Sequence, residues 1–476
     1  MPTTAVSVTP VQFPGRLVML GFGSIGRGVL PLLLKHITLS PERIEILTAE
    51  PAGRAIAEEY GVKFQVEPLT EANYRALLSA RLRRGDFLLN LSVDVSSLAL
   101  VELCAELGAL YLDTCIEPWP GGYTDKSVPA SLRTNYALWW KSRELQKKLG
   151  ASAPTAVLTH GANPGMVSHF VKQALLNIAG DLGQDATAPK DRAGWARLAQ
   201  RLGIKTIHIA ERDTQVSATP KKPGEFVNTW SIDGFISEGS QPAELGWGTH
   251  ERHFPHDGGR HDFGPRTGIF LNRPGAATKV RTWTPIEGPF QAFLITHGEA
   301  ISIPNYYSVE EQGRLVYRPS CHYAYHPCDA AVLSVHELNG KNFQQPTSKR
   351  LMSAEITEGI DELGVLLAGH ARGAYWFGSQ LSIHEARKLA PHNSATSLQV
   401  TSPTMAGVCW AIENPSRGIV DPDEMDFARV LEIVMPYLGP VIGAYSDWTP
   451  LTGRESLFPE DLDREDPWQF KNVRVL

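Results

Sequence analysis

The stretch Arg16-Leu-Val-Met-Leu-Gly-Phe-Gly-Ser-Ile-Gly26 decides the fold of the first part of the chain. Its apolar half, residues 16–20, predicts a short buried strand, and its second half has the spacing G-x-G-x-x-G. Apolar residues then recur at intervals of three and four as far as Leu33, which predicts a helix directly after the turn. A strand, a glycine turn and a helix in this order are typical of a dinucleotide-binding unit.

Each glycine of the turn has a separate physical purpose. Gly21 permits the tight turn, Gly23 lets the backbone approach a pyrophosphate, and Gly26 allows close packing of helix on strand. The helix that begins with Ser24 and Ile25 presents its N-terminal amides to the anion. These five residues are therefore predicted to bind a cofactor.

An acidic residue indicates which dinucleotide binds. A second apolar strand is predicted at residues 44–48, and Glu50 follows it, 24 residues after Gly26. At this distance a carboxylate accepts hydrogen bonds from both ribose hydroxyls of NAD and repels the 2′-phosphate of NADP. We therefore predict NAD.

Alternating strands and helices continue the pattern. Strands are predicted at residues 86–92, 109–113 and 155–159, with a helix at 95–107, which favours a doubly wound parallel sheet of the Rossmann type. Ligands bind beyond the carboxyl ends of such strands. The residues expected to face cofactor or substrate there are Ser92, Asp94, Thr114, Cys115 and Glu117.

Two of these residues have an alternative interpretation. Asp94 could instead be the N-cap of the helix that follows it. Cys115 could be a thiolate nucleophile, although a single thiol near a sheet edge is more often a packing residue.

Several motifs in chain order resemble bacterial homospermidine synthases, a family of the saccharopine-dehydrogenase-like group. They are the glycine turn, the strand ending Asn90-Leu-Ser92, the element Asp113-Thr-Cys-Ile-Glu-Pro-Trp119 and the turn His160-Gly-Ala-Asn-Pro-Gly165. The likeness extends to Asn228-Thr-Trp-Ser-Ile-Asp-Gly-Phe-Ile-Ser-Glu-Gly239 and Thr296-His-Gly-Glu-Ala300. The matching turn adds Asn163 and Pro164 to the predicted cofactor site, and Asn163 to the catalytic residues.

The resemblance implies a transferase whose NAD is reduced and reoxidised within each turnover. Two putrescines would give homospermidine and ammonia, and spermidine is a second expected donor, which would release diaminopropane. The resemblance also implies a homodimer with small polyamines as its substrates.

The residues can be tested against this chemistry. Hydride leaves the carbon beside an amine only when the amine is neutral, so a base must first remove a proton, and His297 is a candidate. The distal ammonium needs carboxylates, for which Glu117, Glu211 and Glu238 are candidates. We expect Glu211 at the rim of a strand that ends at residue 210, and Trp230 in an alternating strand. The Trp230 indole face would stabilise an iminium by a cation–π interaction.

Composition excludes several classes. The 476 residues carry 51 Asp and Glu against 45 Lys and Arg, a net charge of −6, so nucleic acid is not an expected partner. Apolar runs are far shorter than the roughly 18 residues that span a membrane, and no secretory leader is evident. Five scattered cysteines favour a reducing compartment, so we expect a cytoplasmic protein. No spacing typical of a metal site is present, and no metal is predicted.

We expect three parts in the chain. Residues 1–165 form the NAD-binding domain, completed by about 402–445, where a helix is predicted from residue 403. Residues 166–401 form a second α+β domain with a mixed or antiparallel sheet for substrate binding and dimerisation. Residues 446–476 are expected to be a loosely packed extension.

Two other functions remain open. A net NAD-dependent dehydrogenase of an amino acid or semialdehyde would need pocket arginines or lysines for its anionic substrate. A non-catalytic NAD-sensing protein would keep its function when His297 or Glu211 is replaced.

Overall fold

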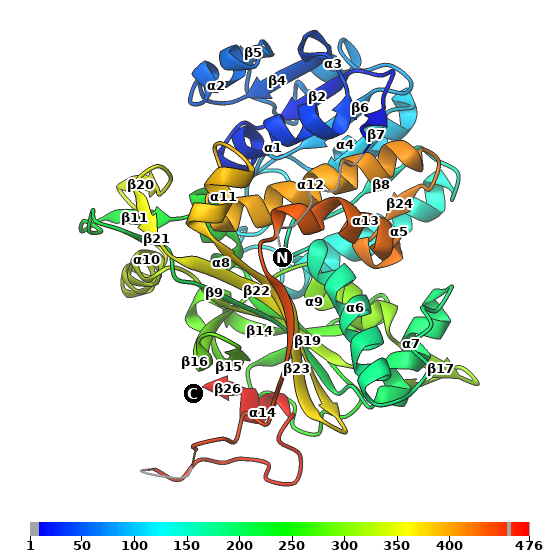
Figure 1. Ribbon diagram of the computed structural model, residues 1–476, viewed down its shortest axis with the longest axis vertical. Helices are drawn as coiled ribbons and strands as arrows, with labels where there is room; N and C mark the ends of the chain where they lie inside the picture. The colour runs from blue at the N-terminus through cyan, green and yellow to red at the C-terminus, as the bar shows by residue number, and fades with distance from the viewer. Residues whose placement is uncertain (1–8, 455–457, 476) are drawn as a thin grey trace.

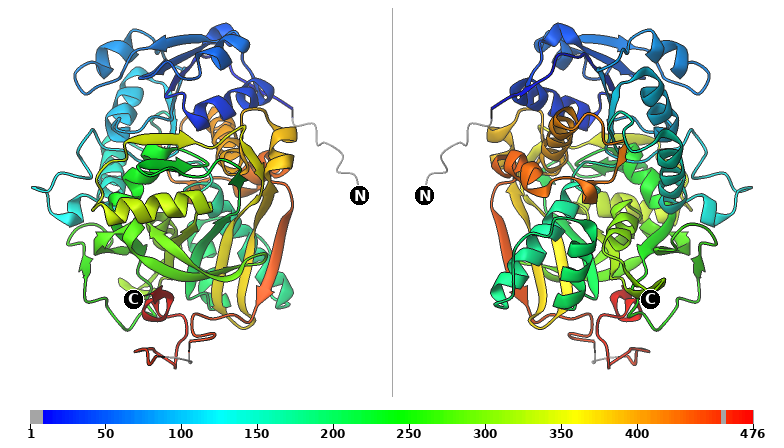
Figure 2. Two further views of the ribbon diagram at one scale, coloured as in Figure 1. Left: turned by 90° about the vertical axis from the view of Figure 1, so that its left-hand side faces the viewer. Right: turned by 90° about the vertical axis from the view of Figure 1, so that its right-hand side faces the viewer.

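Two sheets, one above the other in Figure 1, form the framework of the molecule. The computed structural model describes residues 9–454 and 458–475. The N-terminal sheet lies at one end, and the C-terminal segment lies at the opposite end (Figures 1 and 2). Within the described residues, no helix combines the length and the apolar character needed to cross a membrane.

The first sheet has seven described strands, all parallel, which confirms the predicted doubly wound sheet. The glycine turn directly follows β2, an interior strand of this sheet. In spatial order the strands are β24 (Ile419–Val420), β8 (Ala156–Val157), β7 (Leu110–Asp113), β6 (Phe87–Asn90), β2 (Leu17–Leu20), β4 (Ile44–Thr48) and β5 (Lys63–Val66). The edge strand β24 comes from late in the chain. The boundaries of the three expected parts stay a prediction.

Helices cover both faces of this sheet because its strands are apolar on both sides. On one face pack α1 (Ser24–His36) and α12 (Ala395–Glu413); on the other pack α3 (Tyr74–Ser79), α4 (Ser97–Leu107) and α5 (Asn135–Leu149). Two shorter helices, α2 (Arg54–Glu59) and α13 (Phe427–Val434), complete this half. Helix α12 begins earlier than predicted, at Ala395, because Ser394 caps it and Pro403 is tolerated inside it.

The second sheet is mixed, as predicted. Its strands are β13 (Gly258–Arg260), β14 (Gly268–Pro274), β12 (Pro242–Gly246), β19 (Ser320–His326), β9 (Thr206–Asp213), β22 (Ile360–His370), β23 (Gly373–Ser382) and β25 (Val441–Ser446), with β16 (Gly288–Ile295), β15 (Lys279–Thr284) and β26 (Arg474–Val475) as a branch. Strands β9 and β19 run parallel, and β22 runs antiparallel to β9. This arrangement places three long strands side by side.

Further helices and two-stranded pairs lie outside the two main sheets. The helices are α6 (Met166–Asp181), α7 (Arg192–Leu202), α8 (Ile232–Ser240), α9 (Glu299–Tyr306), α10 (Asp329–Gly340), α11 (Ile383–Leu389) and α14 (Phe470–Val473). Two-stranded pairs are β1 (Val11–Gln12) with β3 (Ile37–Thr38), β10 (Val216–Ser217) with β21 (Ile356–Glu358), β11 (Glu225–Asn228) with β20 (Ser348–Leu351), and β17 (Val309–Glu311) with β18 (Arg314–Tyr317).

The C-terminal segment does not form the loosely packed extension that its polar composition predicted. Trp448 and Trp468 are buried against β22 and β23, and Phe470 is buried in a second apolar cluster. Large aromatic side chains gain enough from leaving water to fix this otherwise irregular segment.

Candidate active site

The glycine turn is shaped for close approach by a ligand backbone. Gly21 has φ +82°, and a Cβ there would lie 2.7 Å from the Leu91 carbonyl oxygen. A Cβ at Gly26 would lie 2.9 Å from the Gly21 carbonyl oxygen, where helix meets turn. At Gly23, by contrast, a Cβ would meet no described heavy atom within 4 Å. The turn is therefore tight on the protein side and open on the outer side, as a pyrophosphate site requires.

A groove runs along the carboxyl ends of β2, β4 and β6. Of the predicted cofactor residues, it is lined by Gly21, Gly23, Glu50, Ser92 and Asp94. Gly23, the N-cap of α1, and Arg27 of the first turn line this groove, and Gly23 offers no side-chain acceptor to the first amides of the helix. This geometry fits an extended dinucleotide with its anionic centre at the helix N-terminus.

Three predicted residues lie elsewhere around the turn. Ser24 lines a neighbouring cavity, and its hydroxyl is buried without a partner among the described residues. Gly26 is buried behind the turn, and Ile25 reaches the adjacent pocket. The alternative role of Asp94 as an N-cap is wrong, because Ser96 caps α4 by accepting a hydrogen bond from the Ala99 amide.

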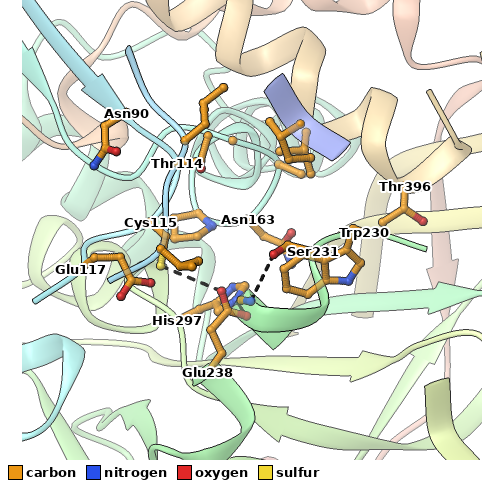
Figure 3. A pocket seen from close by; sticks show the side chains of 18 of the residues that line it. Asn90, Thr114, Cys115, Glu117, Asn163, Trp230, Ser231, Glu238, His297 and Thr396 are labelled. Carbon is orange, nitrogen blue, oxygen red and sulfur yellow. Dashed lines mark hydrogen bonds and ion pairs between the residues drawn. The ribbon is translucent and has the colours of Figure 1, made fainter. Parts of the chain in front are cut away.

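A second cavity lies between the two sheets and shares Ser92 with the groove. All six predicted catalytic residues line it: Glu117, Asn163, Glu211, Trp230, Glu238 and His297. Ile25, Thr114 and Pro164 of the predicted cofactor set line it too. Glu117 and Trp230 lie on opposite sides, with Cys115, Glu238 and His297 between them (Figure 3). Among the described residues, its lining includes no lysine or arginine.

His297 lies between two carboxylates. It follows β16, and its Nε2 is 3.0 Å from Glu238 Oε2 while its Nδ1 is 3.3 Å from Glu299 Oε1. Burial disfavours the charged ring, but Glu238 and Glu299 outweigh this effect and raise the pKa of His297 to about 10. Because a neutral imidazole has one N–H, two carboxylate partners fit the imidazolium.

Glu211 is buried in the sheet, so its predicted place at a rim is wrong. Strand β9 continues past it to Asp213, and β19 and β22 flank it on both sides. Its Oε2 accepts hydrogen bonds from the Tyr323 hydroxyl at 2.7 Å and from Asn163 Nδ2 at 3.0 Å. Burial, reinforced by the nearby Asp213, raises the pKa of Glu211 to about 8.

Trp230 does not lie in a strand as expected. Strand β11 ends at Asn228, and Trp230 occupies a bend before α8, which Ser231 caps through the Gly234 amide. The indole Nε1 donates to the Tyr325 hydroxyl oxygen at 2.9 Å. This local turn, followed by a helix, brings both Trp230 and Glu238 into the lining of the same cavity.

The segment after β7 contributes Cys115 and Glu117. Burial, together with Glu238 and Asp94, raises the pKa of Glu117 to about 8, and its Oε2 has no partner among the described residues. Burial beside Glu117 and Glu238 also raises the pKa of the Cys115 thiol, which lies 3.9 Å from Glu238 Oε1. The alternative of a Cys115 thiolate nucleophile therefore fails on electrostatic grounds.

Sequence reasoning missed several polar residues of this region. Tyr323 lines the cavity, while Glu299, Tyr325, Asp213 and Asp361 lie directly behind lining residues. Alternation in β19 could have placed Tyr323 and Tyr325 on one face. Asp361 meets Asp213 only through the pairing of β22 with β9.

Two family models match consecutive parts of the chain. Residues 17–157 match the model of the saccharopine dehydrogenase NADP binding domain, and residues 161–444 match the saccharopine dehydrogenase C-terminal domain. The chain therefore belongs to the saccharopine dehydrogenase class, which confirms the predicted superfamily.

Similar proteins define a narrower family. The chain is 53% identical to a homospermidine synthase of Blastochloris viridis over 98% of both chains. It is 52% identical to one of Mesorhizobium japonicum, over 98% of this chain and 97% of that one. A crystal structure of the homospermidine synthase of Legionella pneumophila in complex with NAD is similar at a TM-score of 0.91 and 49% identity, covering 98% and 99% of the two chains. The chain belongs to the homospermidine synthase family.

Proposed function

We propose that this protein is an NAD-dependent homospermidine synthase, which joins two putrescines, or spermidine and putrescine, through an imine. The observation that carries the proposal is the inter-sheet cavity, where three glutamates face an indole ring and no lysine or arginine lines the wall among the described residues. Such a lining attracts amines and repels the anionic substrates of a net amino-acid dehydrogenase.

The glycine turn and the groove beside it would hold NAD. Gly21, Gly23 and the N-terminus of α1 fit the pyrophosphate, and Glu50 fits the adenosine ribose. When bound, NAD accepts a hydride from the amine-bearing carbon and later returns it to an imine. The exposed carboxylate of Glu50 favours NAD over NADP, even though the matching family model is described as NADP-binding.

A carboxylate, rather than His297, is the better base for the substrate ammonium. Both nitrogens of His297 already face carboxylates, so the ring holds Glu238 in place as an imidazolium. Glu211 has the properties of the base: it is buried, its pKa is raised to about 8, and Tyr323 and Asn163 fix one of its oxygens. A base is most effective when its pKa lies near the working pH.

The remaining residues serve the exchange of amines. Once the first amine is an iminium, the nitrogen of a second putrescine adds to its carbon, ammonia leaves, and the new carbon–nitrogen double bond is reduced. Trp230 offers its ring face to these cations, worth about 2 kcal/mol where water is excluded. Glu117, whose Oε2 is unpaired among the described residues, is placed to anchor an ammonium group on the far side of the cavity.

The first experiment is a product assay. Purified protein is incubated with putrescine and substoichiometric NAD, and polyamines, ammonia and reduced nicotinamide are followed together. The proposal predicts more homospermidine than NAD, with no accumulation of NADH. Stoichiometric NADH without a coupled amine would support a net dehydrogenase instead, and activity that survives both Glu211→Gln and His297→Ala would contradict the assigned site.

Further properties extend this proposal. We infer a homodimer, a cytoplasmic location and no nucleic-acid partner, on the resemblance, the cysteine content and the net charge of −6. Sedimentation at micromolar concentration tests the dimer, and a purely monomeric protein would refute it.

A further inference from the structure

Trp230 is held at its polar edge by a residue outside the predicted site. Its indole Nε1 donates to the hydroxyl oxygen of Tyr325 at 2.9 Å. Tyr325 is fully buried in β19, and its ring stacks on that of Tyr323, with centroids 5.3 Å apart and planes 15° from parallel. A phenylalanine at position 325 would offer the same ring for packing. The hydroxyl of Tyr325 therefore adds only the hydrogen bond to Trp230.

We propose that Tyr325 is a positioning residue for catalysis, which holds the Trp230 indole so that its face is turned toward the cationic substrate and iminium. This inference rests on the proposed function, because it concerns how the same cavity stabilises positive charge.

Three contacts fix the ring of Trp230. Tyr325 binds its N–H, the Phe235 ring lies 5.6 Å away at an angle of 36°, and Gly234 leaves room for the far edge. A Cβ at Gly234 would lie 3.3 Å from Trp230 Cζ3. Because the indole N–H is a donor only, turning the ring would leave a donor and an acceptor unpaired in a mostly buried place. A single orientation of the ring follows.

The same hydrogen bond favours a cation on the ring face. An indole whose N–H donates a hydrogen bond to an oxygen has a more electron-rich ring, and hydrogen bonds in a poorly solvated interior polarise one another. Tyr325 lies near Glu211, Asp213 and Asp361, and burial beside these carboxylates raises its pKa, so it remains a neutral phenol. Its oxygen is therefore an acceptor throughout turnover.

The neighbouring tyrosine has a different partner, which makes it a matched control. Tyr323 lies two residues earlier on the same face of β19, but its hydroxyl donates to Glu211 at 2.7 Å. Removing either hydroxyl preserves the stacked rings. The two changes therefore separate an effect on Trp230 from an effect on Glu211.

A double-mutant cycle tests the proposal. The kcat for homospermidine is measured at saturating putrescine and NAD for wild type, Tyr325→Phe, Trp230→Phe and the double variant. Tyr325→Phe is expected to lower kcat about fivefold in the wild type and to have no further effect in Trp230→Phe, which has no ring N–H. The control change, Tyr323→Phe, should lower kcat by the same factor in both backgrounds. Equal losses from Tyr325→Phe in both backgrounds would overturn the proposal.

A spectroscopic measurement tests the bond without relying on activity. With indole-¹⁵N tryptophan, the chain gives at most 11 indole signals, and the one missing in Trp230→Phe belongs to Trp230. The proposal predicts a downfield, slowly exchanging Trp230 proton, which moves upfield in Tyr325→Phe and stays in place in Tyr323→Phe. The wild-type spectrum by itself can refute the proposal, even if Tyr325→Phe fails to fold: a Trp230 proton that is not shifted downfield and exchanges rapidly has no such hydrogen bond. A wild type that makes no homospermidine but shows the bonded signal would refute the proposed function and not this contact.

Discussion

The glycine turn and the inter-sheet cavity are two adjoining sites built in opposite ways. At the turn, backbone atoms and the missing side chains of Gly21 and Gly23 create the binding surface, within six consecutive residues. In the cavity, side chains from distant segments converge, and Glu211, His297 and Trp230 each depend on a buried partner. The first site is set by local sequence, whereas the second exists only once both sheets are in place. Substitutions should therefore affect the two sites independently.

Replacing Glu211 should have the largest effect and should be confined to the cavity. Glu211→Gln keeps the side-chain volume but removes the proposed base, so we expect kcat to fall about 10²–10³-fold with unchanged affinity for NAD. An end-point assay of homospermidine measures kcat, and titration with NAD measures the affinity. Glu362→Gln is the matched control. Glu362 lies on the neighbouring strand β22 and is buried like Glu211, but it does not line the cavity. Activity of Glu211→Gln within threefold of wild type would remove Glu211 from the mechanism.

Trp230 should come next. Trp230→Ala removes the ring face and is expected to lower kcat about ten- to thirtyfold, from about 2 kcal/mol of lost cation stabilisation. Trp230→Phe keeps a weaker ring and should retain part of the activity. Equal kcat values for the two variants, measured by homospermidine formation, would eliminate the cation–π role.

Particular residues show why the two sites differ in how far sequence predicts them. Gly21, Gly23 and Glu50 were assigned from spacing alone, and the structure places all three along one groove. Glu211 was expected at a rim because the alternating strand was predicted to end at residue 210, yet pairing with β19 and β22 extends β9 to Asp213. Local patterns cannot show such pairing.

Partners of the cavity residues were the hardest to predict. Glu299 lies two residues after His297, but no local pattern indicates that both carboxylates face one ring. Tyr325 and Asp361 reach the site through sheet register alone. Family resemblance thus indicates residues that line the cavity, whereas the residues that contact them from behind are found only in the assembled sheets.

The pH dependence of activity distinguishes Glu211 from His297, with smaller effects than the substitutions above. Glu211, with its pKa raised to about 8, becomes ionised as the pH rises through 8, so activity should increase there. His297 loses its proton as the pH rises through about 10, so activity should fall above it. The imidazolium also stabilises the fold fully below about 6.5, and this contribution disappears as the pH passes its folded pKa.

Glu299→Gln tests this assignment. Removing one carboxylate from His297 should move the alkaline limb to lower pH by about one unit and leave the acidic limb in place. The profile of kcat at saturating putrescine is compared with that of wild type, so that titration of the amine itself cancels. Glu299→Asp keeps a carboxylate and should return the alkaline limb part of the way to its wild-type position. A profile unchanged in Glu299→Gln would show that His297 does not depend on this carboxylate.

The smallest effect belongs to the groove. Glu50 is exposed, so its hydrogen bonds to a ribose compete with water, and Glu50→Ala should weaken NAD binding only about fivefold. The preference among amines should stay unchanged, because Glu50 lines the groove and not the cavity. Calorimetric titration with NAD and with NADP measures both affinities, and loss of the carboxylate should narrow the difference between the two affinities because a 2′-phosphate is no longer repelled.

Glu58→Ala, an exposed change on the neighbouring helix α2, is the control. Altered amine preference in Glu50→Ala would show that the two sites are coupled, and unchanged NAD affinity would remove Glu50 from the ribose site.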